Sequence, residues 1–160
     1  MTKRRMAREL AVQFLYEADG GINSIELRIN IFFKDFASES LMYNGFINSK
    51  TELYTKKESI EIFDFFKDII IGTLNNIEKI DLLIQKVSKN WSIDRMSRID
   101  RNILRQSIFE MLFHSEIPKN VTINEAIEIA KKFGNEESPF FINGILDAAI
   151  QNINLNKYKI

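Results

Sequence analysis

Helical periodicity is the feature of this sequence that most limits its fold. Near the N-terminus Ala7, Leu10, Ala11, Phe14 and Ala18 recur at steps of three and four, which is the spacing of one face of an α-helix. The same spacing continues along most of the chain, and we find no useful length of the alternation that marks a half-buried β-strand. A chain of 160 residues has the size of one domain with a sizeable core. We therefore predict an all-α fold of six or seven helices in a single domain, residues 1–160.

Breaks in the periodicity divide the first half of the chain. Ser24 is expected to cap the second helix. The pattern fades over residues 38–57, which we interpret as a long irregular insertion. It returns over residues 59–88, and because thirty residues is long for a globular helix, we expect a bend or break at Gly72 or at the Asn75-Asn76 pair.

Capping signals divide the second half. Residues 91–96 are expected to form a turn, after which Ser97 begins a helix. Residues 122–125 read T-I-N-E, the pattern of a capping box. Gly134 is expected to end that helix in the left-handed conformation, and Ser138, followed by a proline, to cap the last helix.

The sequence offers few residues for catalysis or metal binding. It contains no cysteine, and its one histidine, His114, has no partner at metal-ligand spacing. We find no phosphate-binding glycine loop and no nucleophile elbow, and no apolar run approaches the roughly 18 residues of a membrane span. We therefore expect a cytoplasmic protein that is not an enzyme and carries no metal or cofactor.

The arginines are grouped although the chain has 22 basic and 22 acidic residues and no net charge. All but Arg28 lie in an N-terminal cluster and a second cluster: Arg4, Arg5 and Arg8, then Arg95, Arg98, Arg101 and Arg105. The second cluster has acids close by in the sequence, at Asp94, Asp100 and Glu110, so ordinary ion pairs are one interpretation of it.

The N-terminal cluster has no such neighbours, because no acid precedes Glu9. Cations in the first turn of a helix also oppose the helix dipole. Two interpretations remain open at this point: a surface for nucleic acid, whose phosphates arginine binds well, or an idle basic tail.

Two longer segments carry a family resemblance. IDRMSRIDRNILRQSIFEMLF, followed by IPKNVTINEAIEIAKKFGNEESPFFINGILD, resembles the NusB family of bacterial transcription antitermination factors, and RRMARELAVQFLYE resembles the arginine-rich first helix of that family. The V-x-INEAIE-x-AK-x-F pattern and the F-x-NG-x-LD ending are the most specific elements. The resemblance covers residues 1–19 and 91–148 and is thin between them.

The resemblance implies a fold and a function that periodicity and composition do not show. Members of the family consist of two small helical bundles. They bind single-stranded boxA RNA in nascent ribosomal RNA transcripts together with the ribosomal protein NusE. In this way they act in the RNA polymerase antitermination complex that controls ribosomal RNA synthesis.

The resemblance also implies an RNA-binding set, matched position by position: Lys3, Arg4, Arg5, Arg8, Glu137, Ser138 and Phe141. Met6 departs from the arginine-rich motif, because some members have a further arginine there. Phe141 matches an aromatic residue at the RNA surface, where it would stack on a base. Its apolar neighbours in the sequence leave core packing as the alternative.

A second set matches the family's surface for NusE: Tyr16, Asp100, Arg105 and Glu110. Alternatives remain for three of them. Arg105 and Glu110 would also suit internal ion pairs, and Asp100 would suit a helix-start acid after Ser97.

Two further functions compete with RNA-binding antitermination. One is a protein-binding helical module with an idle basic arm. The other is the RNA-binding module of a ribosomal RNA methyltransferase. We expect the latter to be wrong, because no glycine-rich loop for a methyl donor and no Rossmann-type pattern follows the module before Ile160.

Overall fold

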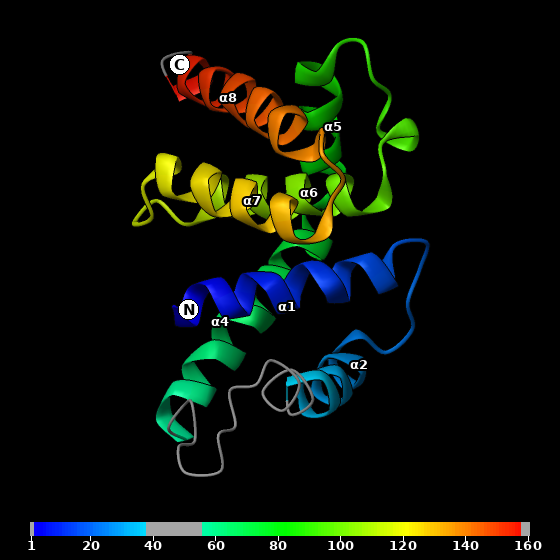
Figure 1. The fold of residues 1–160 in the computed structure, drawn as a ribbon, viewed down its shortest axis with the longest axis vertical. Coiled ribbons are helices and arrows are strands. Elements are labelled where there is room, and N and C mark those ends of the chain that lie inside the picture. The colour runs from blue at the N-terminus through cyan, green and yellow to red at the C-terminus, as the bar shows by residue number, and fades with distance from the viewer. Residues whose placement is uncertain (1, 38–55, 158–160) are drawn as a thin grey trace. The chain divides into compact units, whose positions relative to one another are not determined.

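The computed structural model describes residues 2–37 and 56–157, and within these ranges every regular element is a helix (Figure 1). The seven α-helices are α1 (Lys3–Ala18), α2 (Ile25–Phe32), α4 (Lys56–Asn75), α5 (Ile77–Ser88), α6 (Arg98–Phe113), α7 (Lys119–Phe133) and α8 (Ser138–Lys157). A short π-helix, η1 (Phe33–Ala37), continues α2, and a 3-10 turn, η2 (Ile93–Arg95), lies between α5 and α6. The predicted all-α fold is confirmed. In the described ranges no helix has the length and apolar character needed to cross a membrane.

The predicted insertion at 38–57 falls mostly outside the described residues, which resume at residue 56. Lys56 and Lys57 already belong to α4, so the helix begins earlier than the periodicity indicated.

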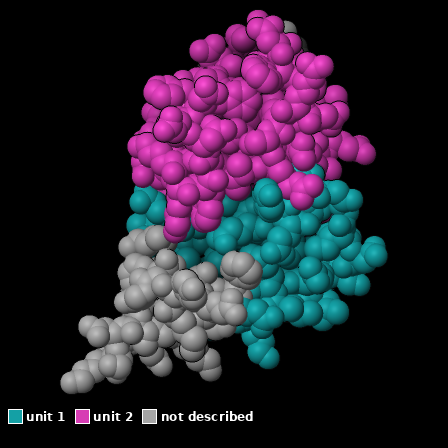
Figure 2. Space-filling model, turned by 45° about the vertical axis from the view of Figure 1, so that its right-hand side comes forward, with its two compact units in different colours: residues 1–70 teal, residues 71–160 magenta. Residues whose placement is uncertain are grey.

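The helices form two compact units, residues 1–70 and 71–160 (Figure 2). Unit 1 contains α1, α2 and most of α4, and unit 2 contains the last residues of α4 and helices α5 to α8. This agrees with the two small bundles that the family resemblance implies. The expectation that the chain is a single domain stays a prediction.

Aromatic rings fill the core of unit 1. Phe66 of α4 has no exposed surface and stacks on Phe32 of α2, with ring centroids 5.8 Å apart. Phe14 of α1 meets both rings edge-on, at 5.4 Å from Phe32 and 6.2 Å from Phe66. Such edge-to-face contacts each add about 0.5–1.5 kcal/mol beyond the burial of apolar area. Three helices that are distant in sequence are therefore joined by one group of rings.

Helix α6 is the central element of unit 2. It packs against α5, α7 and α8, and every residue from Asn102 to Met111 is buried. A helix that is buried on all sides is expected to be apolar all round, yet Arg105, Gln106 and Glu110 lie within this run. These polar side chains need internal partners, two of which are described below.

The long helical stretch breaks where the asparagine pair predicted it. Helix α4 ends at Asn75 and α5 begins at Ile77, with Asn76 at φ −115° between them. The Asn76 side-chain amide donates a hydrogen bond of 2.8 Å to the carbonyl oxygen of Gly72. An asparagine side chain that bonds to a nearby carbonyl in this way competes with continuation of the helix.

Three of the predicted caps are wrong. Helix α8 begins at Ser138 itself, and the Ser138 hydroxyl bonds to Asn135 in the preceding turn instead of capping the helix. Ser24 precedes α2 in the left-handed conformation (φ 55°, ψ 58°), and its side chain makes no capping hydrogen bond. The T-I-N-E segment is not a capping box, because α7 begins earlier, at Lys119, and places Thr122 inside the helix. The Thr122 hydroxyl donates instead to the Glu110 carboxylate of α6, at 2.7 Å. By contrast, Ser97 caps α6 as predicted, accepting from the Asp100 amide at 3.2 Å.

Gly134 ends α7 as expected but for a different reason. Its backbone is extended (φ −90°, ψ −171°) rather than left-handed. A Cβ atom at this position would lie 2.4 Å from the Ser138 hydroxyl oxygen and 2.8 Å from the Ala130 carbonyl oxygen. The close approach of the following turn therefore requires glycine here.

Candidate nucleic-acid interface

The N-terminal cations lie on the first turns of α1. Thr2 caps this helix, its hydroxyl accepting from the Arg5 amide at 3.2 Å, and no acid occupies the first turn. The cations therefore sit at the positive end of the helix dipole, which disfavours them by a few tenths of a kcal/mol each. The prediction that these cations lie in the first turn of a helix, against its dipole, is confirmed.

Acidic residues of α4 lie beside these cations, which sequence neighbours did not reveal. Lys3 forms an ion pair with Glu61, and a 560 Å³ depression is lined by Lys3, Arg4, Glu61, Asp64 and Asp68, together with Phe65. The hydrogen bond that Lys3 donates to the Glu61 carboxylate raises the pKa of Lys3 and lowers the pKa of Glu61. These acids belong to a helix more than fifty residues further along the chain. The absence of acids before Glu9 therefore did not mean that the cations lack acidic neighbours in the fold.

Phe65 forms the apolar side of the depression. The guanidinium carbon of Arg4 lies 5.1 Å from its ring centroid and that of Arg8 lies 5.4 Å away. A cation over an aromatic face gains about 0.5–1 kcal/mol where exposed and about 2 kcal/mol where desolvated. Arg4 is exposed and Arg8 is buried, so the stronger contact belongs to Arg8. Phe65 could not be predicted from the sequence, because the run F-D-F-F carries no signal that selects one ring.

The members of the arginine-rich motif therefore differ in accessibility. Arg4 is exposed, Lys3 and Arg5 are half-buried, and Arg8 is buried against Phe65. Met6, which stands where some family members have a further arginine, is part of the core. A phosphate reaching α1 from solvent would meet the first three residues of the motif more readily than Arg8.

Phe141 lies in unit 2, on the first turn of α8. Its ring is half-buried and meets the ring of Trp91 edge-on, with centroids 6.1 Å apart and an interplanar angle of 79°. Trp91 is 53% exposed, and the neighbouring Phe140 is 84% exposed. Phe141 is thus neither fully buried in the core nor isolated on the surface.

The turn before α8 holds the other two residues of the predicted RNA set. The Asn135 side-chain oxygen accepts from the amides of Glu137 at 2.9 Å and Ser138 at 3.1 Å. The Ser138 hydroxyl accepts in return from the Asn135 amide at 3.0 Å. Ser138 is buried and Glu137 is exposed, so Ser138 fixes the turn, whereas Glu137 faces solvent.

Asp100 and Tyr16 of the predicted partner set lie in different units. Tyr16, on α1, is half-exposed. Asp100, on the first turn of α6, is buried, and its Oδ1 atom has no hydrogen-bond partner among the described residues. A buried carboxylate oxygen without a donor costs about 1–3 kcal/mol or more. Asp100 is thus an acid at the start of a helix, which was one of its two predicted roles, and its Oδ1 atom is an acceptor without a donor among the described residues.

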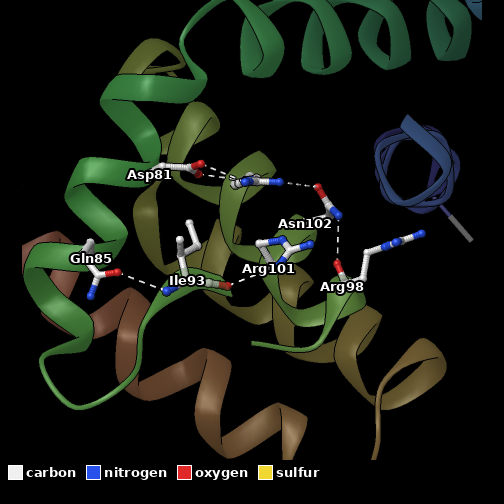
Figure 3. Close-up of polar contacts among 7 residues, drawn as sticks. Asp81, Gln85, Ile93, Arg98, Arg101 and Asn102 are labelled. Carbon is white, nitrogen blue, oxygen red and sulfur yellow. Dashed lines mark hydrogen bonds and ion pairs between the residues drawn. The ribbon is translucent and has the colours of Figure 1, made fainter. Parts of the chain in front are cut away.

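Arg105 makes internal contacts in unit 2. Its Nε and Nη2 atoms donate to the two carboxylate oxygens of Asp81 on α5, each at 2.8 Å. Arg101 donates to the Ile93 carbonyl oxygen at 3.3 Å, and the Ile93 amide donates to the Gln85 side chain at 3.1 Å (Figure 3). Arg105 therefore forms an ion pair, as predicted for the second arginine cluster, but with Asp81, which sequence neighbours did not suggest. Arg101 bonds to a backbone carbonyl oxygen.

Glu110 is buried on α6 and accepts the 2.7 Å hydrogen bond from Thr122 of α7. Arg105 and Glu110 thus connect α6 to α5 and α7, respectively. Any effect of these two residues on a partner would act through the placement of α6.

Known proteins resemble this chain over nearly its whole length. The NusB family profile matches residues 5–151. A transcription antitermination protein NusB from Geotalea daltonii is 47% identical over 151 residues, which cover 92% of this chain and 93% of the relative. A NusB from Desulforamulus reducens is 40% identical, covering 93% and 90%.

Solved structures give the same result. A NusB structure from T. maritima is 34% identical, with a TM-score of 0.65 and coverage of 94% of this chain and 92% of that one. A crystal structure of the antitermination factors NusB and NusE in complex with double-stranded RNA is 27% identical, with a TM-score of 0.70 and coverage of 95% and 98%. The family consists of non-catalytic transcription antitermination factors, so the prediction of a non-enzymatic role is confirmed. The chain belongs to the NusB family.

Proposed function

We propose that this protein is a cytoplasmic transcription antitermination factor that binds single-stranded boxA RNA of ribosomal RNA transcripts together with NusE. It would act as part of the antitermination complex on RNA polymerase. Family membership supports the class of function. The observation on the chain itself that carries the proposal is the group of cations on the first turns of α1, of which Arg4 is exposed.

Lys3, Arg4 and Arg5 are the proposed phosphate contacts. Arg8 is buried over Phe65, so it supports the surface from beneath. RNA phosphates would compete with Glu61 for Lys3. This ion pair is exposed to solvent, and exposed pairs contribute little to stability, so the exchange costs little.

Phe141 is the proposed base contact in unit 2, with Glu137 beside it. The edge of the Phe141 ring against Trp91 holds it in place, and stacking of a base is worth about 1–3 kcal/mol. Ser138 contributes by fixing the turn through Asn135.

Asp100 and Tyr16 are the proposed direct contacts for NusE. Tyr16 is half-exposed and therefore accessible to a partner, and both residues match the family's surface for NusE. Arg105 and Glu110 would act indirectly, by placing helix α6, which carries Asp100.

The proposal is tested by titrating fluorescently labelled boxA RNA with the protein, with and without NusE, over a range of salt concentrations. In the Arg4→Ala/Arg5→Ala variant we expect weaker binding and a salt dependence reduced by about one unit of slope for each lost phosphate contact. Arg28→Ala is the matched control, because Arg28 is an exposed arginine of unit 1 outside the cluster. An unchanged salt slope in the double variant would contradict the assignment of the arm.

A protein-binding module with an idle arm remains the second candidate, and the Lys3–Glu61 ion pair favours it. The same titration separates the two. This second candidate predicts normal binding of NusE with no binding of boxA RNA by either the free protein or the heterodimer.

A further inference from the structure

A second surface lies in unit 2 and includes none of the residues assigned above to RNA or NusE. Helices α5 and α8 and the segment between α6 and α7 line an open groove of about 680 Å³. Aliphatic side chains, among them Leu82, Leu83 and Ile117, form an aliphatic floor between the polar lining residues. Leu82 is 72% exposed, so its side chain is accessible to a partner.

The rim of this groove is cationic. Lys79, Lys86 and Lys119 line it, and none of its described lining residues is Asp or Glu. The carboxylate of Glu116 contacts His114, a lining residue, at 2.7 Å. Helix α7 also begins here without a side-chain cap on its first amides, which adds partial positive charge.

The spacing on α5 fits an extended partner. Lys79, Leu82, Leu83 and Lys86 follow one another at steps of three, one and three residues, so they share one face of the helix. The two lysines stand two turns apart, about 10 Å along the axis. Glutamates two turns apart on a partner helix would meet both lysines while leucines between them entered the groove.

We propose that this groove binds an acidic amphipathic helix of a protein partner. The lysines recognise its carboxylates and the aliphatic floor takes its apolar side chains, in the manner of a helix in a groove. RNA fits this surface less well, because unpaired bases stack on aromatic rings and no Phe, Tyr or Trp is among the described residues that line the groove. The proposal does not depend on RNA binding by the N-terminal arm.

The test uses the full chain, labelled with nitrogen-15, and a fluorescent helical peptide with leucines at steps of three and four and glutamates on either side. We expect saturable binding with amide shift changes at Leu82, Leu83 and Ile117. Lys79→Glu/Lys86→Glu should weaken binding by about tenfold or more, and Leu82→Asp should weaken it without unfolding an already exposed site. Lys89→Glu is the control, because Lys89 is an exposed lysine of the same unit outside the groove.

Several outcomes would overturn the proposal. These are a dissociation constant above about 1 mM, equal binding of a peptide with lysine in place of glutamate, or shift changes confined to other surfaces. Groove shifts that depend on protein concentration alone would assign the surface to a second copy of this chain. A loss of RNA affinity in Lys79→Glu/Lys86→Glu as large as in Arg4→Ala/Arg5→Ala would assign it to RNA.

Discussion

Arg105 and Asp81 form a two-point contact in which both nitrogens of one edge of the guanidinium reach both oxygens of the carboxylate, each at 2.8 Å. The contact joins α6 to α5. Arg105 is buried, while the Asp81 side chain is 27% exposed. A paired geometry of this kind depends on the planar fork of arginine, which lysine lacks.

Replacing Arg105 therefore tests whether its role is internal. We expect Arg105→Lys to lower the free energy of unfolding by about 1.5–3 kcal/mol, the value of hydrogen bonds to charged groups, as measured by urea denaturation. NusE affinity, measured by calorimetry well below the melting temperature, should fall little. A large loss of affinity with unchanged stability would instead make Arg105 a direct partner contact.

Gly72 tests close packing inside unit 2. A Cβ atom at this position would lie 2.1 Å from two ring carbons of Phe109, which is buried. We expect Gly72→Ala to destabilise the protein by about 1–3 kcal/mol through overpacking, which exceeds the gain of about 1 kcal/mol in helix propensity. Gly144 of α8 is the control, because a Cβ there meets nothing within 4 Å, and Gly144→Ala should raise the melting temperature.

The ion pair at the N-terminal arm has a defined response to pH. Since the hydrogen bond to Lys3 lowers the pKa of Glu61, the interaction is fully present above the ordinary Glu61 value of 4.5 and is lost as the pH falls through the lowered pKa. On the alkaline side, the raised pKa of Lys3 keeps the pair intact until the pH passes that raised pKa, above the ordinary value of 10.5. An NMR titration should find the Glu61 midpoint below 4.5 and should find it moved upward in Lys3→Ala. Lys57→Ala should move it less, since Lys57 acts only through its charge. An identical midpoint in wild type and Lys3→Ala would show that the pair does not form in solution.

Substitutions at Phe141 distinguish a ring that stacks on an RNA base from a ring that packs in the core. We expect Phe141→Ala to weaken boxA RNA binding by about 1–3 kcal/mol while losing less stability than the 3–5 kcal/mol of a buried phenylalanine, because its ring is half-buried. Phe141→Tyr keeps the ring and should bind and melt nearly normally. Fluorescence of Trp91, the single tryptophan, reports directly on the Phe141 ring. A large fall in melting temperature for both variants would place Phe141 in the core.

The sequence predicts the helices better than their contacts. The Asn75-Asn76 break and the Ser97 cap depend on residues close together in the chain, and both predictions are correct. Thr122 was misinterpreted because its hydroxyl has two possible partners, a local amide and the Glu110 carboxylate twelve residues away, and tertiary packing selects the second.

The same limit applies to the candidate site. The arginine cluster of α1 is visible in the sequence, whereas Glu61 and Phe65 beside it come from α4 and carry no motif. Likewise, nothing in the sequence distinguishes Asp81 from the other acidic residues, and only the fold shows that it contacts Arg105. Pairing between distant segments is set by the fold, so periodicity and spacing cannot supply it.

The continuous burial of α6 limits which amino-acid substitutions this protein can tolerate. A typical surface helix presents a solvent stripe, and substitutions there are usually within about 0.5 kcal/mol of neutral. From Asn102 to Met111 no such stripe exists, so each position is constrained by volume or by a polar partner. A library of single substitutions should show its longest uninterrupted run of intolerant positions here, and substitutions that do survive in this helix should require compensating changes in α5, α7 or α8.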